Sequence, residues 1–175
     1  MLTTRLPIRV EPYRLAANAE RIEGLISLAG MTRFGGEAGE QWGDCEVRLD
    51  FGVDTQGRRF IEGWLKADVQ LACRRCLEPM PVILESHFLL GMVASDALAA
   101  ELSNAYEPVL VENEQLDLLP VIEDELILSL PQVVYHDETQ CAVSRDQMTS
   151  GESAEAVEKP AANPFDVLRT LKDKH

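Results

Sequence analysis

The sequence predicts an α+β fold, in which one main helix packs on an antiparallel β-meander and a flexible C-terminal tail ends in a short helix. Hydrophobic and polar residues alternate through three long runs in the middle of the chain, as in strands with one buried face. A later segment repeats its hydrophobic residues at helical spacing. Near the C-terminus a stretch lacks large apolar side chains and is too polar to join a core. We therefore expect a single α+β domain over residues 1–144, a flexible linker over 145–162 and a helix over 163–175.

The segment before the meander predicts short elements. Pro12 is tolerated in the first turn of a helix, and the run Leu15–Ala17 can continue one. Residues 21–28 predict a short strand. Residues 29–43 contain five glycines, which predict a loop.

The meander itself is predicted from three strands. Residues 44–53 and 59–73 alternate in hydropathy, and Gly57 supplies the backbone freedom that a tight hairpin turn between them needs. The alternation breaks at residues 74–79 and resumes over 81–93. These three runs predict consecutive antiparallel strands.

The rest of the chain predicts mainly helix. A short helix is expected over 96–103 and a short strand over 107–111. Residues 116–131 predict the main helix, because Asp117 can cap it and Pro131 can end it. The terminal segment has Asn163 as a cap, followed by an apolar stripe of Phe165, Leu168 and Leu171.

Charge divides the chain into two unlike halves. The net charge is -14; residues 1–80 carry 11 Lys/Arg and 12 Asp/Glu, whereas residues 81–175 carry 5 and 18. An acidic surface attracts basic partners, or simply keeps a protein soluble. Because an acidic surface repels phosphate, a contact with RNA would come from the nearly neutral first half. No secretory leader and no membrane span is evident, so we expect a cytoplasmic protein that binds neither membrane nor DNA.

A Cys-x-x-Cys pair, Cys73 and Cys76, lies between two predicted strands. Two thiolates at this spacing can form half of a zinc site. Cys141 and His136 follow the main helix and are the candidates to complete it. A redox pair fits less well, since such pairs precede a helix, and a structural turn with free thiols remains an alternative. Zinc is the only cofactor that the sequence suggests.

Two other candidate ligands are expected to lie too far from this turn. If the first hairpin turns near residue 56, Cys45 lies opposite Ala67, about 20 Å along the strand from Cys73. A second turn near Leu77 would place His87 opposite Ala67 as well. Both are therefore expected in the middle of the sheet.

Binding residues are predicted from charge and from apolar stripes. Four arginines are the candidates for contact with RNA: Arg58, Arg59, Arg74 and Arg75. Glu123, Asp124 and Glu125 are consecutive, so on a helix they point in different directions, and we expect a solvated acidic patch. This patch and the terminal stripe Phe165, Leu168 and Leu171 are the candidates for contact with a protein partner.

No catalytic motif is present, which predicts a protein that is not an enzyme. The alternative is a metal-dependent nuclease, which would need clustered carboxylates. The two central strands carry five acidic residues: Asp44, Glu46, Asp50, Glu62 and Asp68. They alternate with core residues, which indicates the solvent-exposed face of a sheet and not a catalytic cluster.

Five stretches together resemble a known bacterial family. They are "LACRRCLEPM" at 71–80, "AYEPV" at 105–109, "LDLLPVIEDELILSLP" at 116–131, "HDETQC" at 136–141 and "NPFDVLRTLK" at 163–172. In this order and spacing they resemble the YceD family of large ribosomal RNA subunit accumulation proteins, in its proteobacterial form. Members from other bacterial groups have more cysteines after the long helix than the single Cys141 here.

The resemblance implies a non-enzymatic role in the synthesis, processing or accumulation of the large-subunit (23S) ribosomal RNA. The implied partners are the precursor of that RNA, or a basic ribosomal protein or assembly factor. The family motif falls on Cys73, Arg75, Cys76, Glu123, Leu126, Leu130, Pro131 and Cys141.

Overall fold

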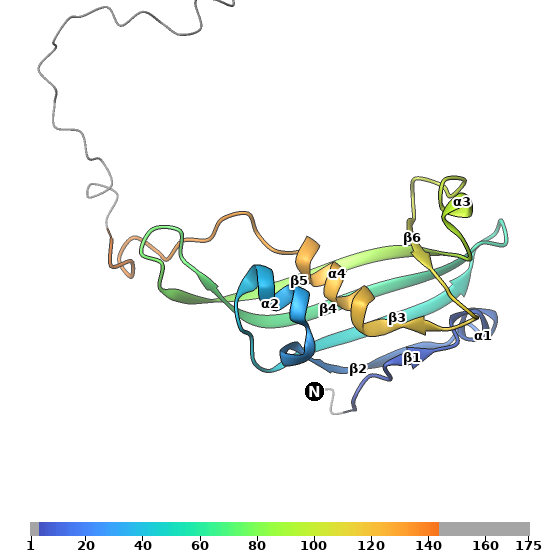
Figure 1. Ribbon diagram of the computed structural model, residues 1–175, viewed down its shortest axis with the longest axis horizontal. Coiled ribbons are helices and arrows are strands. Elements are labelled where there is room, and N and C mark those ends of the chain that lie inside the picture. Colours follow the sequence, from blue (N-terminus) through green and yellow to red (C-terminus); the bar gives the residue numbers. More distant parts are fainter. Residues whose placement is uncertain (1–3, 144–175) are drawn as a thin grey trace, which may run out of the picture. The chain divides into compact units, whose positions relative to one another are not determined.

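The computed structural model describes residues 4–143 and confirms the predicted α+β class (Figure 1). The predicted linker over 145–162 and the terminal helix over 163–175 lie outside the described residues. In the described part, no helix is long and apolar enough to cross a membrane. The elements in chain order are β1 (Arg9–Val10), α1 (Pro12–Ala17), β2 (Arg21–Ser27), the 3-10 helix η1 (Leu28–Gly30), α2 (Thr32–Ala38), β3 (Asp44–Val53), β4 (Arg59–Ala72), β5 (Pro79–Val93), α3 (Asp96–Ala99), β6 (Glu107–Leu110), β7 (Leu116–Asp117) and α4 (Leu118–Leu128).

The main sheet has five strands in the order β2-β3-β4-β5-β6. The three predicted strands are β3, β4 and β5, and tight turns join them into the predicted antiparallel meander. Strand β2 extends it by pairing antiparallel with β3. The last strand, β6, pairs in parallel with β5, since α3 and its loops carry the chain back before β6 begins. A separate two-stranded sheet joins β1 to β7, which the sequence did not predict.

The two hairpins differ in how well their register was predicted. Cys45 lies opposite Ala67, as expected from the turn at residues 54–58. Ala67 faces Leu84 on its other side, whereas His87 faces Trp64, so the predicted pairing of His87 with Ala67 is wrong by three residues. The cause is the position of the Cys-x-x-Cys turn, whose centre lies between Arg75 and Cys76 rather than at Leu77. Cys45 and His87 still lie in the middle of the sheet, away from this turn.

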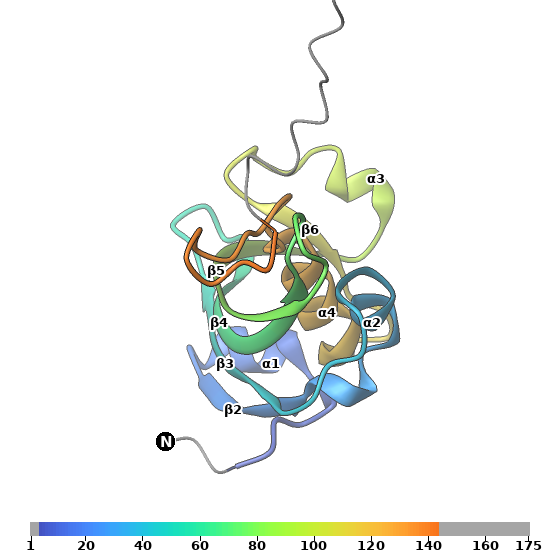
Figure 2. The same ribbon diagram turned by 90° about the vertical axis from the view of Figure 1, so that its left-hand side faces the viewer.

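The core lies between the inner face of the sheet and α4. Figure 2 shows the strands in an arc, with α2 and α4 inside it. The inward residues of β3 and β4 alternate with exposed ones, as the sequence pattern predicts. Leu118, Ile122 and Leu126 of α4 are completely buried against them. Asp117 caps the start of α4, as predicted, because its side chain accepts a hydrogen bond from the backbone N–H of Leu119 at 3.2 Å.

The loop that the glycines predict over residues 29–43 is confined mainly to residues 39–43, since Leu28–Gly30 form η1 and Thr32–Ala38 form α2. Two glycines inside α2 disfavour a helix by about 1 kcal/mol each. Tertiary contacts offset this cost: Phe34 is completely buried, and a carboxylate from α4 binds the first turn of α2. The helix therefore depends on its neighbour, and for that reason the local sequence does not reveal it.

Candidate metal centre

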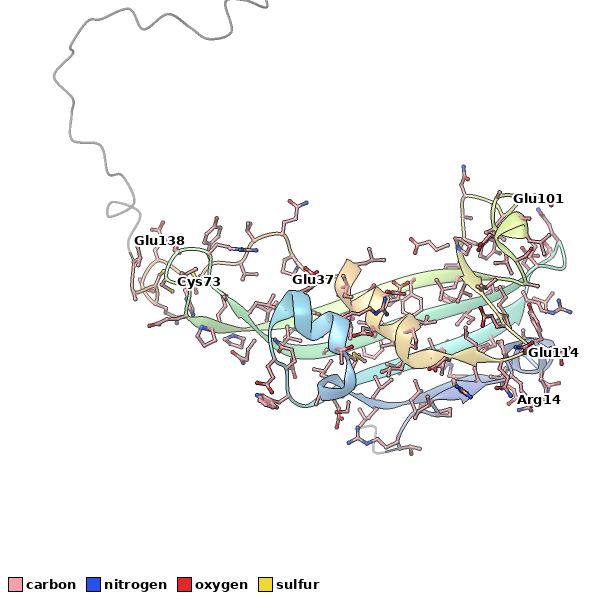
Figure 3. All side chains as sticks on the ribbon, viewed as in Figure 1. Arg14, Glu37, Cys73, Glu101, Glu114 and Glu138 are labelled. Atoms are coloured by element: carbon pink, nitrogen blue, oxygen red, sulfur yellow. The ribbon has the colours of Figure 1, made fainter. Side chains whose placement is uncertain are left out.

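The turn between β4 and β5 has the hydrogen bonds of a thiolate-binding knuckle. Cys73 follows β4 directly, and its N–H donates to the carbonyl oxygen of Glu78 at 2.9 Å. The N–H of Leu77 donates to the carbonyl oxygen of Cys73 at 2.9 Å. Leu77 has a φ of +64°, the left-handed conformation that reverses the chain just after Cys76. Figure 3 labels Cys73 at the end of the long hairpin.

The segment that follows α4 returns to this turn. The N–H of Arg74 donates to the carbonyl oxygen of Val134 at 2.9 Å, which adds a backbone link between the two segments. The N–H of His136 then points at the sulfur of Cys73, at 3.4 Å. Cys141 lies beyond it, with its Sγ 4.0 Å from that of Cys73. Residues sixty or more positions apart in the chain thus meet at one point.

The four candidate ligands are close enough to hold one ion. The Sγ of Cys76 lies 3.3 Å from Nδ1 of His136, and all four donor atoms lie within 4.8 Å of one another. A tetrahedral zinc ion, with bonds of about 2.3 Å to sulfur and about 2.0 Å to nitrogen, separates its donors by about 3.5–3.8 Å. The donors therefore need to move only slightly to close on zinc. Three thiols and one imidazole are the donor set of structural zinc sites, whereas magnesium and calcium prefer oxygen.

The thiols differ in acidity because their hydrogen bonds differ. Burial alone would raise the pKa of the Cys73 thiol, but backbone N–H donors from Cys76, His136 and Arg75 more than offset it and lower this pKa to about 5. At Cys76 the N–H of Glu78 lowers the pKa, but burial and the neighbouring thiols raise it more, so the net shift is upward. Cys73 is thus prepared to bind a metal as a thiolate.

Cys45 has the opposite environment. Its side chain is completely buried in the sheet, and burial raises its pKa to about 12. It is a packed thiol, as the sequence analysis expected, and it lies far from the metal-binding turn.

The knuckle also positions two of the four predicted RNA-binding arginines. The guanidinium of Arg75 lies 5.4 Å from the centre of the Tyr135 ring and donates to the carbonyl oxygen of His136. Its Nε is buried and has no partner among the described residues. Arg74 is exposed. Tyr135 was not predicted as part of this site, although its position beside His136 is the one signal that the sequence offers.

The other two arginines lie at the opposite end of β4. Arg58 pairs with Asp54 at 3.0 Å and lies 5.4 Å over the ring of Tyr106. Arg59 lies 5.0 Å over the ring of Tyr13. A strand of 14 residues, about 45 Å long, separates this pair from the knuckle. The four arginines therefore form two separate groups instead of one surface.

The predicted solvated patch on α4 is wrong for two of its three residues. Glu123 is only 6% exposed, and its Oε1 accepts the backbone N–H of Arg33 at 2.6 Å and of Phe34 at 3.0 Å. Its Oε2 lies 3.1 Å from Nε of Arg33. Asp124 is exposed and pairs with Nη1 of the same arginine at 2.5 Å. Arg33 was missed because it lies in the glycine-rich stretch that predicted a loop.

Glu125 is the second exception, since it is also only 6% exposed. Burial, together with the carboxylates of Glu107 and Asp124, raises its pKa to about 7. The remaining partner-binding candidates, Phe165, Leu168 and Leu171, lie outside the described residues.

Comparison with known proteins agrees with the resemblance noted in the sequence. A family model described as "Large ribosomal RNA subunit accumulation protein YceD" matches residues 61–172. A protein of that name from Haemophilus influenzae is 35% identical over 175 residues, which cover 99% of this chain and 100% of that protein. No solved structure matches this chain. The chain belongs to the YceD family.

Proposed function

We propose that this protein is a non-enzymatic factor that supports the accumulation of the large-subunit ribosomal RNA. One observation carries this proposal: the similarity to a relative named for that role extends over nearly the whole of both chains. It therefore includes the sheet, α4 and the segment that returns to the Cys-x-x-Cys turn.

The metal-binding group supports a structural role better than a catalytic one. All four positions of a tetrahedral zinc ion would be filled by Cys73, Cys76, His136 and Cys141, whereas a catalytic zinc keeps one position for water. Bound zinc would fix the segment after α4 against the end of β4 and so hold Arg74 and Arg75 in place.

The nuclease alternative has little support in the described part of the chain. A nuclease of this kind needs carboxylates that converge on metal ions. The acidic residues of β3 and β4 are spread along the outer face of the sheet, and two of them are neutralised: Asp50 pairs with Arg21 at 2.5 Å and Asp44 pairs with Arg5. Among residues 4–143, the group with the spacing of metal ligands is the Cys/His group.

Binding to a basic protein is proposed as the main source of affinity. The second half of the chain is strongly acidic and has no Lys or Arg between Arg75 and Arg145. Such a surface attracts basic ribosomal proteins and repels RNA phosphates. Arg74 and Arg75 are proposed to add a local contact with ribosomal RNA, since an arginine stacked on a tyrosine is suited to unpaired nucleotides.

The proposed function is tested by deleting the gene and measuring the ratio of large-subunit to small-subunit ribosomal RNA. We expect the ratio to fall and to recover when the wild-type chain is supplied from a plasmid. An unchanged ratio in the deletion strain would refute the proposed role. Purified protein that cleaves the ribosomal RNA precursor only with a divalent metal would favour the nuclease instead.

A further inference from the structure

A pocket opens on the outer face of the sheet, at the end near α3 and opposite the β4–β5 turn that carries the metal centre (Figure 1). It has a volume of about 420 Å³, and strands β4 and β5 and the loop before β6 line it. Aromatic and apolar residues predominate in the lining, with one carboxylate and one imidazole: Phe60, Phe88, Leu89, Tyr106, Glu62 and His87. Glu62 and His87 are exposed, and Phe60 and Tyr106 are half-buried, so the pocket is open to a partner.

Glycines let two aromatic rings lie close to the sheet at this pocket. In the register of the strands, Phe60 lies between Gly52 of β3 and Gly91 of β5. A Cβ at Gly52 would come within 2.6 Å of the Phe60 ring, and a Cβ at Gly91 would lie 3.1 Å from Cβ of Tyr106. The hydroxyl of Tyr106 donates to Oδ2 of Asp54 at 3.0 Å. Both rings are therefore in place before any partner binds, which lowers the entropy cost of binding.

Glu62 carries the negative charge of this pocket and has no cation of its own. On β4 it faces Asp50 of β3 on one side and Leu89 of β5 on the other. Arg21 of β2 pairs with Asp50 at 2.5 Å, so this row of outward side chains has one cation for two carboxylates. Within residues 4–143, Glu62 makes no hydrogen bond or ion pair. Like charges directly opposite each other destabilise a sheet, so a cation that reached Glu62 would be attracted.

Aromatic rings beside a free carboxylate form a site for an organic cation. A lysine or arginine within about 6 Å of a ring centre is attracted by the face of the ring, and a carboxylate adds a charged hydrogen bond. This chain already contains such a contact, since the guanidinium of Arg58 lies 5.4 Å from the centre of the Tyr106 ring. None of the residues that line the pocket is Lys or Arg, so a phosphate group would meet repulsion from Glu62.

We propose that this pocket binds a lysine or arginine side chain of a basic protein partner, which pairs with Glu62. The apolar stem of either side chain would lie against Phe60 and Leu89, which are half-buried and have surface left to cover. The inference rests on the proposed function and adds to it a place and a chemistry for the contact with a basic protein.

The test compares Glu62→Gln with Asp68→Asn in the full-length chain. Both remove one negative charge from an exposed position on the same face of β4, but Asp68 lies about 20 Å further along the strand and outside the pocket. The probes are individually purified basic proteins of the large ribosomal subunit and, separately, a transcript of its RNA. We expect at least one protein to bind, with its Kd raised about fivefold or more by Glu62→Gln and less than about twofold by Asp68→Asn.

A second variant, Phe60→Leu, tests the aromatic part of the pocket. Leucine keeps an apolar side chain but removes the ring, so the Kd should rise about two- to fivefold. Glu62→Gln relieves the repulsion from Asp50 and should not lower the melting temperature, so loss of folding cannot explain its effect.

Equal effects of Glu62→Gln and Asp68→Asn would overturn the inference, since they would indicate attraction by overall charge. An unchanged Kd for Phe60→Leu would also overturn it. So would binding of the transcript without any of the proteins, or the absence of all binding.

The inference and the proposed function can fail separately. A deletion strain with a normal ratio of ribosomal RNAs would refute the proposed function. A deletion strain with a low ratio that Glu62→Lys restores as fully as the wild-type chain would refute the pocket alone, because this substitution places a positive charge where the partner's cation would bind.

Discussion

Glu123→Ala should destabilise the fold, although Glu123 belongs to a run of acidic residues typical of an exposed surface. Its Oε1 accepts the N–H groups of Arg33 and Phe34, at 2.6 and 3.0 Å. These lie in the first turn of α2, where N–H groups have no partner within the helix, and Met31 before the helix provides no side-chain cap. The carboxylate therefore caps α2 from another element and also opposes the positive end of the helix dipole.

The size of the effect follows from these contacts. Phe34 is completely buried, so its N–H would lose its only acceptor without gaining water, which costs about 1–3 kcal/mol. The N–H of Arg33 loses a hydrogen bond to a charged acceptor, which adds about 1 kcal/mol. The sum is a loss of about 2–4 kcal/mol for Glu123→Ala. Glu123→Gln keeps an oxygen at the position of Oε1 and should cost about 1 kcal/mol.

The assay is urea unfolding at pH 7, with Asp124→Asn as the control. Asp124 is exposed and contacts the same arginine, so its substitution should leave the free energy of unfolding unchanged within error. The reasoning is refuted if Glu123→Ala unfolds within about 0.5 kcal/mol of the wild type at an equal m-value. It is also refuted if Asp124→Asn costs as much as Glu123→Ala.

Three further predictions concern the metal centre and α4. Native mass spectrometry should find one zinc ion per wild-type chain and none in Cys73→Ser or Cys141→Ser. A wild-type chain that carries no metal and has the same melting temperature as both variants would contradict the site. Burial and two acidic neighbours raise the pKa of Glu125 to about 7, from an ordinary value of 4.5. In this range the folded state holds a proton that the unfolded state releases. The free energy of unfolding should therefore fall as the pH rises from about 4.5 to about 7. Relative to Glu125→Gln, the wild type should lose about 2–3 kcal/mol over this window in urea unfolding, and a constant difference would contradict it. Leu77→Gly should raise the free energy of unfolding by about 0.5–1 kcal/mol, because Leu77 is 73% exposed with a φ of +64°; a decrease would show that its side chain stabilises the turn.

The sheet could be predicted from the sequence because alternation reports burial directly. The pairing of Cys45 with Ala67 followed from a short turn whose glycine fixes the register. The pairing of His87 could not be derived in the same way. The turn before β5 is shaped by hydrogen bonds around Cys73, and the sequence does not show its centre.

The candidate site could be predicted where residue type alone defines the chemistry. Cysteine and histidine are few in this chain, so the four metal-ligand candidates were identifiable before their proximity was known. The burial of Glu123 and Glu125 could not be predicted, because it depends on how α4 packs against α2 and the sheet. The contacts of Arg33 could not be predicted for the same reason, since its partners lie about ninety residues away in the chain.

The most direct test of the central claim, a role in accumulation of the large-subunit ribosomal RNA, is to follow newly made RNA while the protein is depleted. Cells are pulse-labelled at intervals, and the label in mature large-subunit RNA is divided by that in small-subunit RNA. The account expects this ratio to fall before growth slows, and expects continued wild-type expression to prevent the fall. A ratio that stays constant until growth stops would contradict it.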